Sequence, residues 1–237
     1  MNEKYELTEE FEEIETWRKG WLQKIKVYRI RALRAFADVK IGDLGGFVET
    51  KQNLSNMGNA WVYGDAKVCD NAEVYDNARV RDNAWVYGDA RVCGDARVCG
   101  DARVCGDAEV YGNAWVYGNA EVYGNAWVYG NAEVCDNAKV YGNAEVCGDA
   151  KVCDNANIFW CSSIGSRHAT TTMFRNKDSG ITVTCGCFMG TLEEFAGIVE
   201  KEHGENIFGK EYKLLIELAK IHFGLQDETK GEEENGI

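Results

Sequence analysis

The 237-residue sequence has no proline, only three histidines and no long apolar run. No stretch approaches the ~20 apolar residues that a membrane-spanning helix needs, so we expect no such helix. The first residues, MNEKYELTEE, are charged and lack the apolar core of a secretory signal peptide. We therefore expect a soluble protein of the cytoplasm.

Positive charge is also scarce. The chain has 26 Lys and Arg against 39 Asp and Glu, which gives a formal net charge of −13 at pH 7. A strongly acidic surface repels the phosphate backbone, so general nucleic-acid binding is not expected. The partners that remain are proteins and small molecules.

What the chain has in abundance is a six-residue period. Ala recurs every six residues from Ala60 to Ala156, and Val follows two residues later from Val62 to Val152, with Ile158 in the next unit. The unit A-x-V-z-[GD]-[ND] occurs sixteen times without an insertion, and Ala156 with Ile158 begins a seventeenth unit. A fixed period this short predicts a solenoid.

Each unit predicts one short strand and one corner. Ala and Val are two residues apart, so both side chains point to the same side of an extended strand. The Gly or Asp and the Asn or Asp that follow tolerate the left-handed backbone of a sharp bend. Three successive units close one triangular coil, and stacked coils pair as parallel strands.

The period resembles that of the hexapeptide-repeat, left-handed parallel β-helix family. The segments YRIRAL, DVKIGDLGGFVE, NLSNMGNAWVYG and ITVTCGCFMGTLEEF are similar to those of phage and prophage members, often labelled transferase or polymer-forming protein. The resemblance implies the left hand of the coil and a homotrimer. We expect a mainly β fold, with a left-handed parallel β-helix, an α/β N-terminal cap and a C-terminal ββαα unit.

The flanking segments predict four regions. These are an N-terminal cap of helix and strand (1–50), the β-helix (51–160), a ββαα domain (161–225) and a disordered acidic tail (226–237). In the cap, Thr8 begins a predicted helix with Phe11, Ile14 and Trp17 on one face, ending near Gly20. The alternating segment 26–33, KVYRIRAL, predicts a strand.

After Ile158 the repeat stops, and residues 158–170 predict an irregular exit. Residues 170–176 and 181–188 predict two strands around the turn KDSG. Thr191 and Glu194 form a capping box for a helix ending near Lys201. A second amphipathic helix is predicted from about Lys210 to Phe223. This unit either covers the open end of the β-helix or forms a separate binding module.

The positions of the histidines bear on whether the chain is an acyltransferase. Many hexapeptide enzymes transfer acyl groups, with a histidine in or beside the coils as general base. This chain has none before Arg167, and its strict period leaves no inserted loop to hold coenzyme A. His168 is the candidate base, and a solvated loop histidine is the alternative. We expect no cofactor.

Cysteines offer a second kind of chemistry. Cys185 and Cys187 form a CxC pair on a predicted strand, which is a candidate metal site, but no second pair follows. Packing is the alternative role. Seven other cysteines follow Val in the repeats, where only Cys135 and Cys153 are three units apart and hence stacked. We expect all of them to be reduced thiols.

The outward positions of the repeats are rich in aromatic residues. The position before Val carries Trp61, Trp85, Trp115 and Trp127, and the position after Val carries eight Tyr. So many aromatic side chains on flat faces indicate a contact surface for sister subunits or a partner. The alternative is cross-strand stacking that only stiffens the sheet.

Five arginines lie within two coils. The candidate ligand-binding residues are Arg79, Arg81, Arg91, Arg97 and Arg103, with Trp85, Trp115 and Tyr117 beside them. Arg79 and Arg97 are three units apart, so they stack on one face, and such a group can hold a phosphate or a nucleotide. The alternative is a solvated surface in which these arginines pair with Asp82, Asp95, Asp101 and Glu109.

These observations favour a non-enzymatic, oligomeric binding protein. The phage resemblance implies a role in the host cytoplasm, either acting on a host protein that takes part in defence or sequestering a small, nucleotide-like anion. An acyltransferase-like enzyme is the first alternative, and a structural or scaffold protein is the second.

Overall fold

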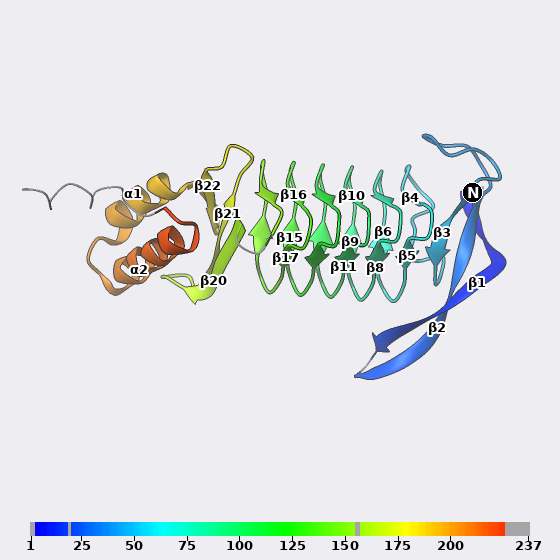
Figure 1. Ribbon diagram of the computed structural model, residues 1–237, viewed down its shortest axis with the longest axis horizontal. Helices are drawn as coiled ribbons and strands as arrows, with labels where there is room; N and C mark the ends of the chain where they lie inside the picture. The colour runs from blue at the N-terminus through cyan, green and yellow to red at the C-terminus, as the bar shows by residue number, and fades with distance from the viewer. Residues whose placement is uncertain (1–2, 19, 155–156, 226–237) are drawn as a thin grey trace, which may run out of the picture.

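The computed structural model describes residues 3–18, 20–154 and 157–225. It is an elongated molecule with a β-solenoid in the middle, the N-terminal strands at one end and two helices at the other (Figure 1). The predicted acidic tail, residues 226–237, lies outside the described residues. No helix in the described part of the chain is long and apolar enough to cross a membrane.

The solenoid consists of two-residue strands, one in each six-residue unit. They are β4 (Trp61–Val62), β5 (Lys67–Val68), β6 (Glu73–Val74), β7 (Arg79–Val80), β8 (Trp85–Val86), β9 (Arg91–Val92), β10 (Arg97–Val98), β11 (Arg103–Val104), β12 (Glu109–Val110), β13 (Trp115–Val116), β14 (Glu121–Val122), β15 (Trp127–Val128), β16 (Glu133–Val134), β17 (Lys139–Val140), β18 (Glu145–Val146) and β19 (Lys151–Val152). Each strand from β4 to β16 pairs in parallel with the strand three units further on, as Val80 does with Val98. The predicted parallel solenoid with three-sided coils is confirmed.

The interior of the solenoid is a column of Ala and Val. From Ala60 to Val146 every repeat Ala and Val is fully buried. At the corners, Gly or Asp adopts a left-handed backbone, with φ of 70° at Gly106 and 63° at Asp82. The next residue stacks on its counterpart in the following coil, as the Asn77 amide does in donating to Asp95 at 3.1 Å. The corner chemistry therefore serves both the bend and the stacking of coils.

The N-terminal end is formed by strands, and the predicted helix is wrong. β1 (Tyr5–Arg18) and β2 (Trp21–Ala32) form a long antiparallel hairpin, which we call the arm, and β3 (Leu44–Val48) joins β2 to the solenoid sheet. Gly20 does not end a helix, because it lies in the hairpin turn with φ of 83°. Pairing with β2 overrides the helical spacing that Phe11, Ile14 and Trp17 suggest.

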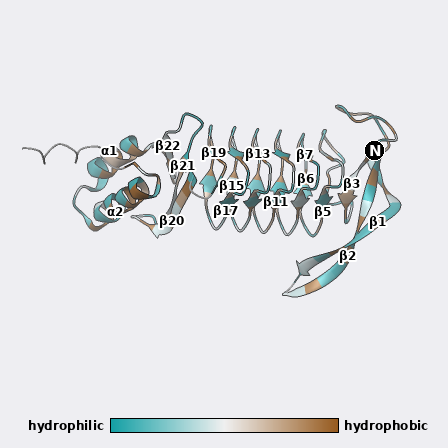
Figure 2. Ribbon diagram, in the orientation of Figure 1, coloured by the Kyte–Doolittle hydropathy of each residue, from teal (hydrophilic) through white to brown (hydrophobic). Residues whose placement is uncertain are grey.

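Alternation along β1 shows why it is a strand. Ile14 and Thr16 are buried, whereas Phe11 and Trp17 are exposed on the other side of the arm. Ile14 packs in a cluster with Phe47 and Cys69 of the first coils. Teal and brown patches alternate along both strands of the arm (Figure 2).

Polar contacts fasten the arm to the solenoid. The Arg18 guanidinium forms ion pairs with Asp70, at 2.5 Å, and with Glu49. Further along the arm, Glu12 pairs with Lys67 at 3.0 Å. The arm therefore covers the first coils of the face that contains β5 and β8.

The burial of Trp61 also differs from the prediction. The repeat predicts an exposed Trp61, yet it is 1% exposed, because Tyr5 and Phe36 cover it with ring centroids at 6.1 and 5.3 Å. The Tyr5 hydroxyl donates to the Leu54 carbonyl at 2.9 Å. The first coil is thus closed by residues from before the repeats.

At the other end, four strands and two helices follow the repeats. They are β20 (Ile158–Ile164), β21 (Ala169–Arg175), β22 (Ile181–Cys185), β23 (Phe188–Thr191), α1 (Leu192–His203) and α2 (Ile207–His222). The two predicted helices and the Thr191–Glu194 capping box are confirmed. The predicted irregular exit is wrong at its start, because β20 pairs with β21. The helices pack on this sheet through Phe195, Tyr212 and Leu215.

Two repeat cysteines differ from the expectation of reduced thiols. Cys135 and Cys153, stacked on neighbouring coils, are joined in a disulfide. The other eight cysteines are free. The three-unit spacing identified the pair but not its oxidation.

Candidate functional site

Because each coil has three sides, the outward residues lie on three separate faces. We call the face formed by β4, β7, β10, β13, β16 and β19 the arginine face. It carries Arg79 and Arg97 in register on neighbouring coils, and Trp115 is the next residue in the same row. Arg81 and Tyr117 belong to this face as the residues that follow Val80 and Val116. The structure thus brings together five of the eight predicted ligand-binding residues.

The other three predicted residues lie elsewhere. Arg91 is on the face of β6 and β9, where it forms an ion pair with Glu109 at 3.4 Å. Arg103 is in register with Trp85 on the face that the arm partly covers. Trp85 packs against the cluster beneath the arm. A six-residue step moves to the next face, so closeness in sequence overstated the size of the group.

Arg79 is held in place from outside the repeats. Its guanidinium lies 3.2 Å from a carboxylate oxygen of Asp38, and the Tyr63 hydroxyl donates to the same oxygen at 2.9 Å. Burial and the bond to Asp38 raise the pKa of Tyr63 to about 12. Asp38, Tyr63 and Arg79 form the wall of a cavity of about 220 Å³, which Arg81 also lines. Asp82 lines it as well, so the cavity combines two arginines with two carboxylates.

The next coil adds an aromatic platform. The Arg97 guanidinium carbon lies 4.7 Å from the centroid of the Trp115 ring, which is a cation–π contact. Trp115 meets the Tyr117 ring at an interplanar angle of 83°. The Tyr117 hydroxyl donates to Glu133 at 3.3 Å. Burial, with Glu133 nearby, raises the pKa of Tyr117, so this hydroxyl stays a donor at neutral pH.

The proposed pairing of these arginines with acidic residues holds only in part. Asp82 accepts from the Gly100 amide at 3.1 Å, and Asp101 accepts from Asn83 at 3.1 Å. These carboxylates therefore serve the corners of the coils. In the part of the chain that the structure describes, Arg81 and Arg97 form no ion pair. Their positive charge remains available on this face.

Aromatic stacking is present, but on the other two faces. Tyr111 and Tyr129 are stacked at 4.8 Å, and Tyr123 and Tyr141 at 5.0 Å. On the arginine face, Tyr63 and Tyr117 are separated by the coils that carry Arg81 and Cys99. The stiffening role thus describes two faces better than the third.

The candidate base lies outside the solenoid. His168 is exposed in the turn between β20 and β21, with φ of 48°. Its backbone amide donates to the Gly165 carbonyl at 3.2 Å. The structure places it in a tight hairpin turn after the coils.

The CxC pair occupies a hairpin. Cys185 ends β22, and Cys187 lies in the two-residue turn before β23. The Cys185 sulfur accepts from the Thr171 hydroxyl at 3.2 Å, and the Cys187 sulfur lies 3.7 Å from Nη1 of Arg167. Among residues 3–18, 20–154 and 157–225, no third ligand joins this pair, and the one cluster with metal-ligand spacing contains the bonded Cys135 and Cys153 with Asp136.

The repeats also permit a comparison with known families. They match the YdcK beta solenoid repeat. The matched segments are residues 72–88, 90–106, 102–118 and 114–130. The five predicted residues on the arginine face all fall within these segments. No curated protein sequence matches the chain significantly. The match supports the repeat architecture and does not imply any activity.

The two residues that hold Arg79 in place were not among the predicted ones. Tyr63 lies three repeat units before Arg81, so the period itself would have placed it on the arginine face. Asp38 lies before the repeats, two residues after Phe36, whose ring contacts Trp61. No signal in the sequence points from Asp38 to Arg79.

Proposed function

We propose that this chain is a non-enzymatic β-solenoid protein that binds an anionic, nucleotide-like ligand on its arginine face. The observation that carries the proposal is the pair Arg81 and Arg97, which form no ion pair among the described residues although the chain has a net charge of −13. Phosphate oxygens suit the forked donors of arginine. Trp115 offers a ring surface beside them.

The phage resemblance supports the rest of the proposal. It favours the left-handed hexapeptide type of β-helix, a homotrimer and a role in the host cytoplasm, by sequestering a nucleotide signal or by acting on a host defence protein. Acyl transfer has less support, because His168 lies in an exposed turn after the coils. Native mass spectrometry of protein purified gently from cells would identify a retained ligand and the number of subunits.

A charge-matched pair of variants tests the site. R81Q/R97Q removes two positive charges from the arginine face, whereas R91Q/R103Q removes two from the outward positions of the other faces. With ATP carrying a fluorescent N-methylanthraniloyl group as probe, we expect R81Q/R97Q to weaken binding by about tenfold or more, since each charged hydrogen bond contributes about 1.5–3 kcal/mol.

The control should stay close to the wild-type affinity, within about twofold. Equal weakening in both double variants would mean that only net charge matters. Equal affinity in R81Q/R97Q and the wild type would remove the arginine face as the binding site.

A further inference from the structure

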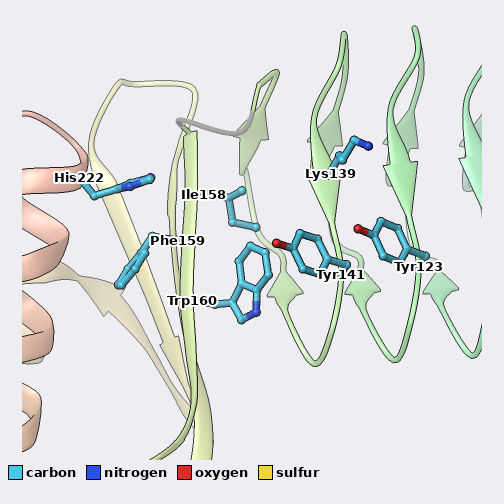
Figure 3. Close-up of a pocket in the computed structure, with 7 residues that line it drawn as sticks. All are labelled: Tyr123, Lys139, Tyr141, Ile158, Phe159, Trp160 and His222. Atoms are coloured by element: carbon cyan, nitrogen blue, oxygen red, sulfur yellow. The ribbon is translucent and has the colours of Figure 1, made fainter.

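A separate cavity lies where the solenoid meets the C-terminal unit. Its volume is about 450 Å³, within the range of small-molecule sites. It is lined by Tyr123, Lys139 and Tyr141 of the last coils, by Ile158, Phe159 and Trp160 of β20, and by His222 of α2. Figure 3 shows these seven side chains, and we call the cavity the junction pocket.

The pocket exists because an aromatic row is interrupted. Tyr123 and Tyr141 are stacked, with rings 3° from parallel. Phe159 is the next residue in this row by spacing, but β17 is the last strand of its sheet and β20 pairs with β21 instead. Phe159 therefore packs against His222 at 5.3 Å and leaves Tyr141.

Trp160 then closes one side of the gap. Its ring meets Tyr141 edge to face, with centroids at 4.4 Å and an interplanar angle of 88°. In Figure 3 the two stacked tyrosines end at Trp160, while Phe159 and His222 lie on the far side. The walls are flat rings that suit a planar ligand, because offset or edge contacts between rings are favourable.

The polar side chains of the pocket include several hydrogen-bond donors, together with the His222 imidazole, which can donate or accept. Lys139 brings an ammonium group, and Tyr123 and Tyr141 bring hydroxyls. No carboxylate is among the described residues that line the pocket, although the chain as a whole has 39 Asp and Glu. Glu121 lies outside the lining, 3.3 Å from the Lys139 ammonium in a half-exposed pair. Donors without a carboxylate in the lining favour a ligand with acceptor oxygens and negative charge.

We infer that the junction pocket binds a planar aromatic acid of one or two rings. The ring lies against Tyr141 and Trp160, and its carboxylate accepts from Lys139. This site uses no residue of the arginine face, so it goes beyond the proposed function and stands or fails separately.

Calorimetric titration of the full chain tests it with 2-naphthoate as probe. We expect saturable binding with Kd below about 1 mM, and 2-naphthalenemethanol, the uncharged analogue, should bind about fivefold more weakly or worse. Lys139→Met should weaken naphthoate binding by a similar factor. Lys151→Met, at the same repeat position on the arginine face, should leave it within about twofold.

A second matched pair examines the aromatic wall. Tyr141→Ala should weaken naphthoate binding by about tenfold, whereas Tyr111→Ala, in the equivalent stack on another face, should leave it unchanged. If Tyr141→Ala does not fold by circular dichroism, the exposed Lys139 decides, through Lys139→Met alone.

Several outcomes would overturn the inference. They are no saturable binding of 2-naphthoate by the folded wild type, wild-type affinity in Lys139→Met, and equal weakening in Tyr141→Ala and Tyr111→Ala. R81Q/R97Q should bind naphthoate as the wild type does, so a failure of the arginine face leaves this test intact.

Discussion

The repeats and the two ends of the molecule obey different rules. Inside the solenoid, a residue's place in the six-residue unit determines its burial and its neighbours, as Val80, Val98 and Val116 show by stacking in one row. At the N-terminal end apolar spacing misleads, because the arm folds as strands where Phe11, Ile14 and Trp17 suggest a helix. At the C-terminal end, α1 and α2 are helices as predicted. A sequence period predicts burial reliably when the neighbouring coil has the same period. A single segment depends on the partner it finds.

The largest expected effect comes from a charge placed inside the repeats. Val104 is fully buried between Val86 and Val122. Val104→Asp loses apolar burial and places a carboxylate among apolar side chains, so we expect it to lower the free energy of unfolding by more than about 4 kcal/mol. Urea unfolding followed by circular dichroism measures this change.

The neighbouring residue supplies the control. Arg103 is exposed on the same strand, and Arg103→Asn should change the free energy of unfolding by less than about 0.5 kcal/mol. A Val104→Asp protein as stable as Arg103→Asn would show that the solenoid interior admits water, and the contrast between inward and outward positions would fail.

Two glycines compare a repeat corner with an end helix. A Cβ on Gly106, at φ of 70°, would lie 2.9 Å from the backbone nitrogen of Gly124 in the next coil. Gly197, inside α1, has nothing within 4 Å of its added Cβ. Gly106→Ala should therefore lower the free energy of unfolding by about 1–3 kcal/mol, because of the strained backbone and the close approach to Gly124. Gly197→Ala should raise the free energy of unfolding by up to about 1 kcal/mol, since alanine is the better helix former.

Thermal unfolding of both variants gives the signs directly. If Gly106→Ala melts at or above the wild-type temperature, the corner has room to shift, and the coils are less tightly stacked than the structure shows.

The sequence predicts those parts of the fold whose signals are periodic or local. Parallel pairing of every third unit follows from the period, and the α1 cap follows from Thr191 and Glu194, which are local signals. The arm depends on the pairing of β1 with β2, from Tyr5 with Ala32 at its base to the turn at Gly20. Trp61 is buried by Tyr5 and Phe36, which come from outside the period.

The candidate site likewise contains residues that the repeat period predicts and residues that it does not. The three-unit spacing places Arg79, Arg97 and Trp115 in one row, and the structure agrees. It could not supply Asp38, whose loop precedes the repeats. The junction pocket was also missed, because it arises where β20 abandons the row that Tyr123 and Tyr141 begin. The departure of Phe159 from that row depends on pairing with β21.

A last prediction concerns the loss of stability in mild alkali. Burial raises the pKa of the Cys69, Cys93, Cys105 and Cys147 thiols above their usual range. Unfolded thiols ionise near about pH 8.5, while the folded protein keeps these protons. The folded state then binds more protons, so the free energy of unfolding falls as pH rises above about 8.5.

One buried lysine acts in the opposite direction. Burial, with Arg34 nearby, lowers the pKa of Lys4 to about 8. Between about pH 8 and 10.5 the unfolded state binds the extra proton, so this group alone makes the folded state more stable as pH rises. Four thiols outweigh one ammonium group, and we expect a lower urea midpoint at pH 9.5 than at pH 7.5 in oxygen-free buffer. Cys69→Ala, which removes the thiol beneath the arm, should reduce that drop, whereas a midpoint that rises with pH would mean that Lys4 dominates and that the repeat thiols are open to water.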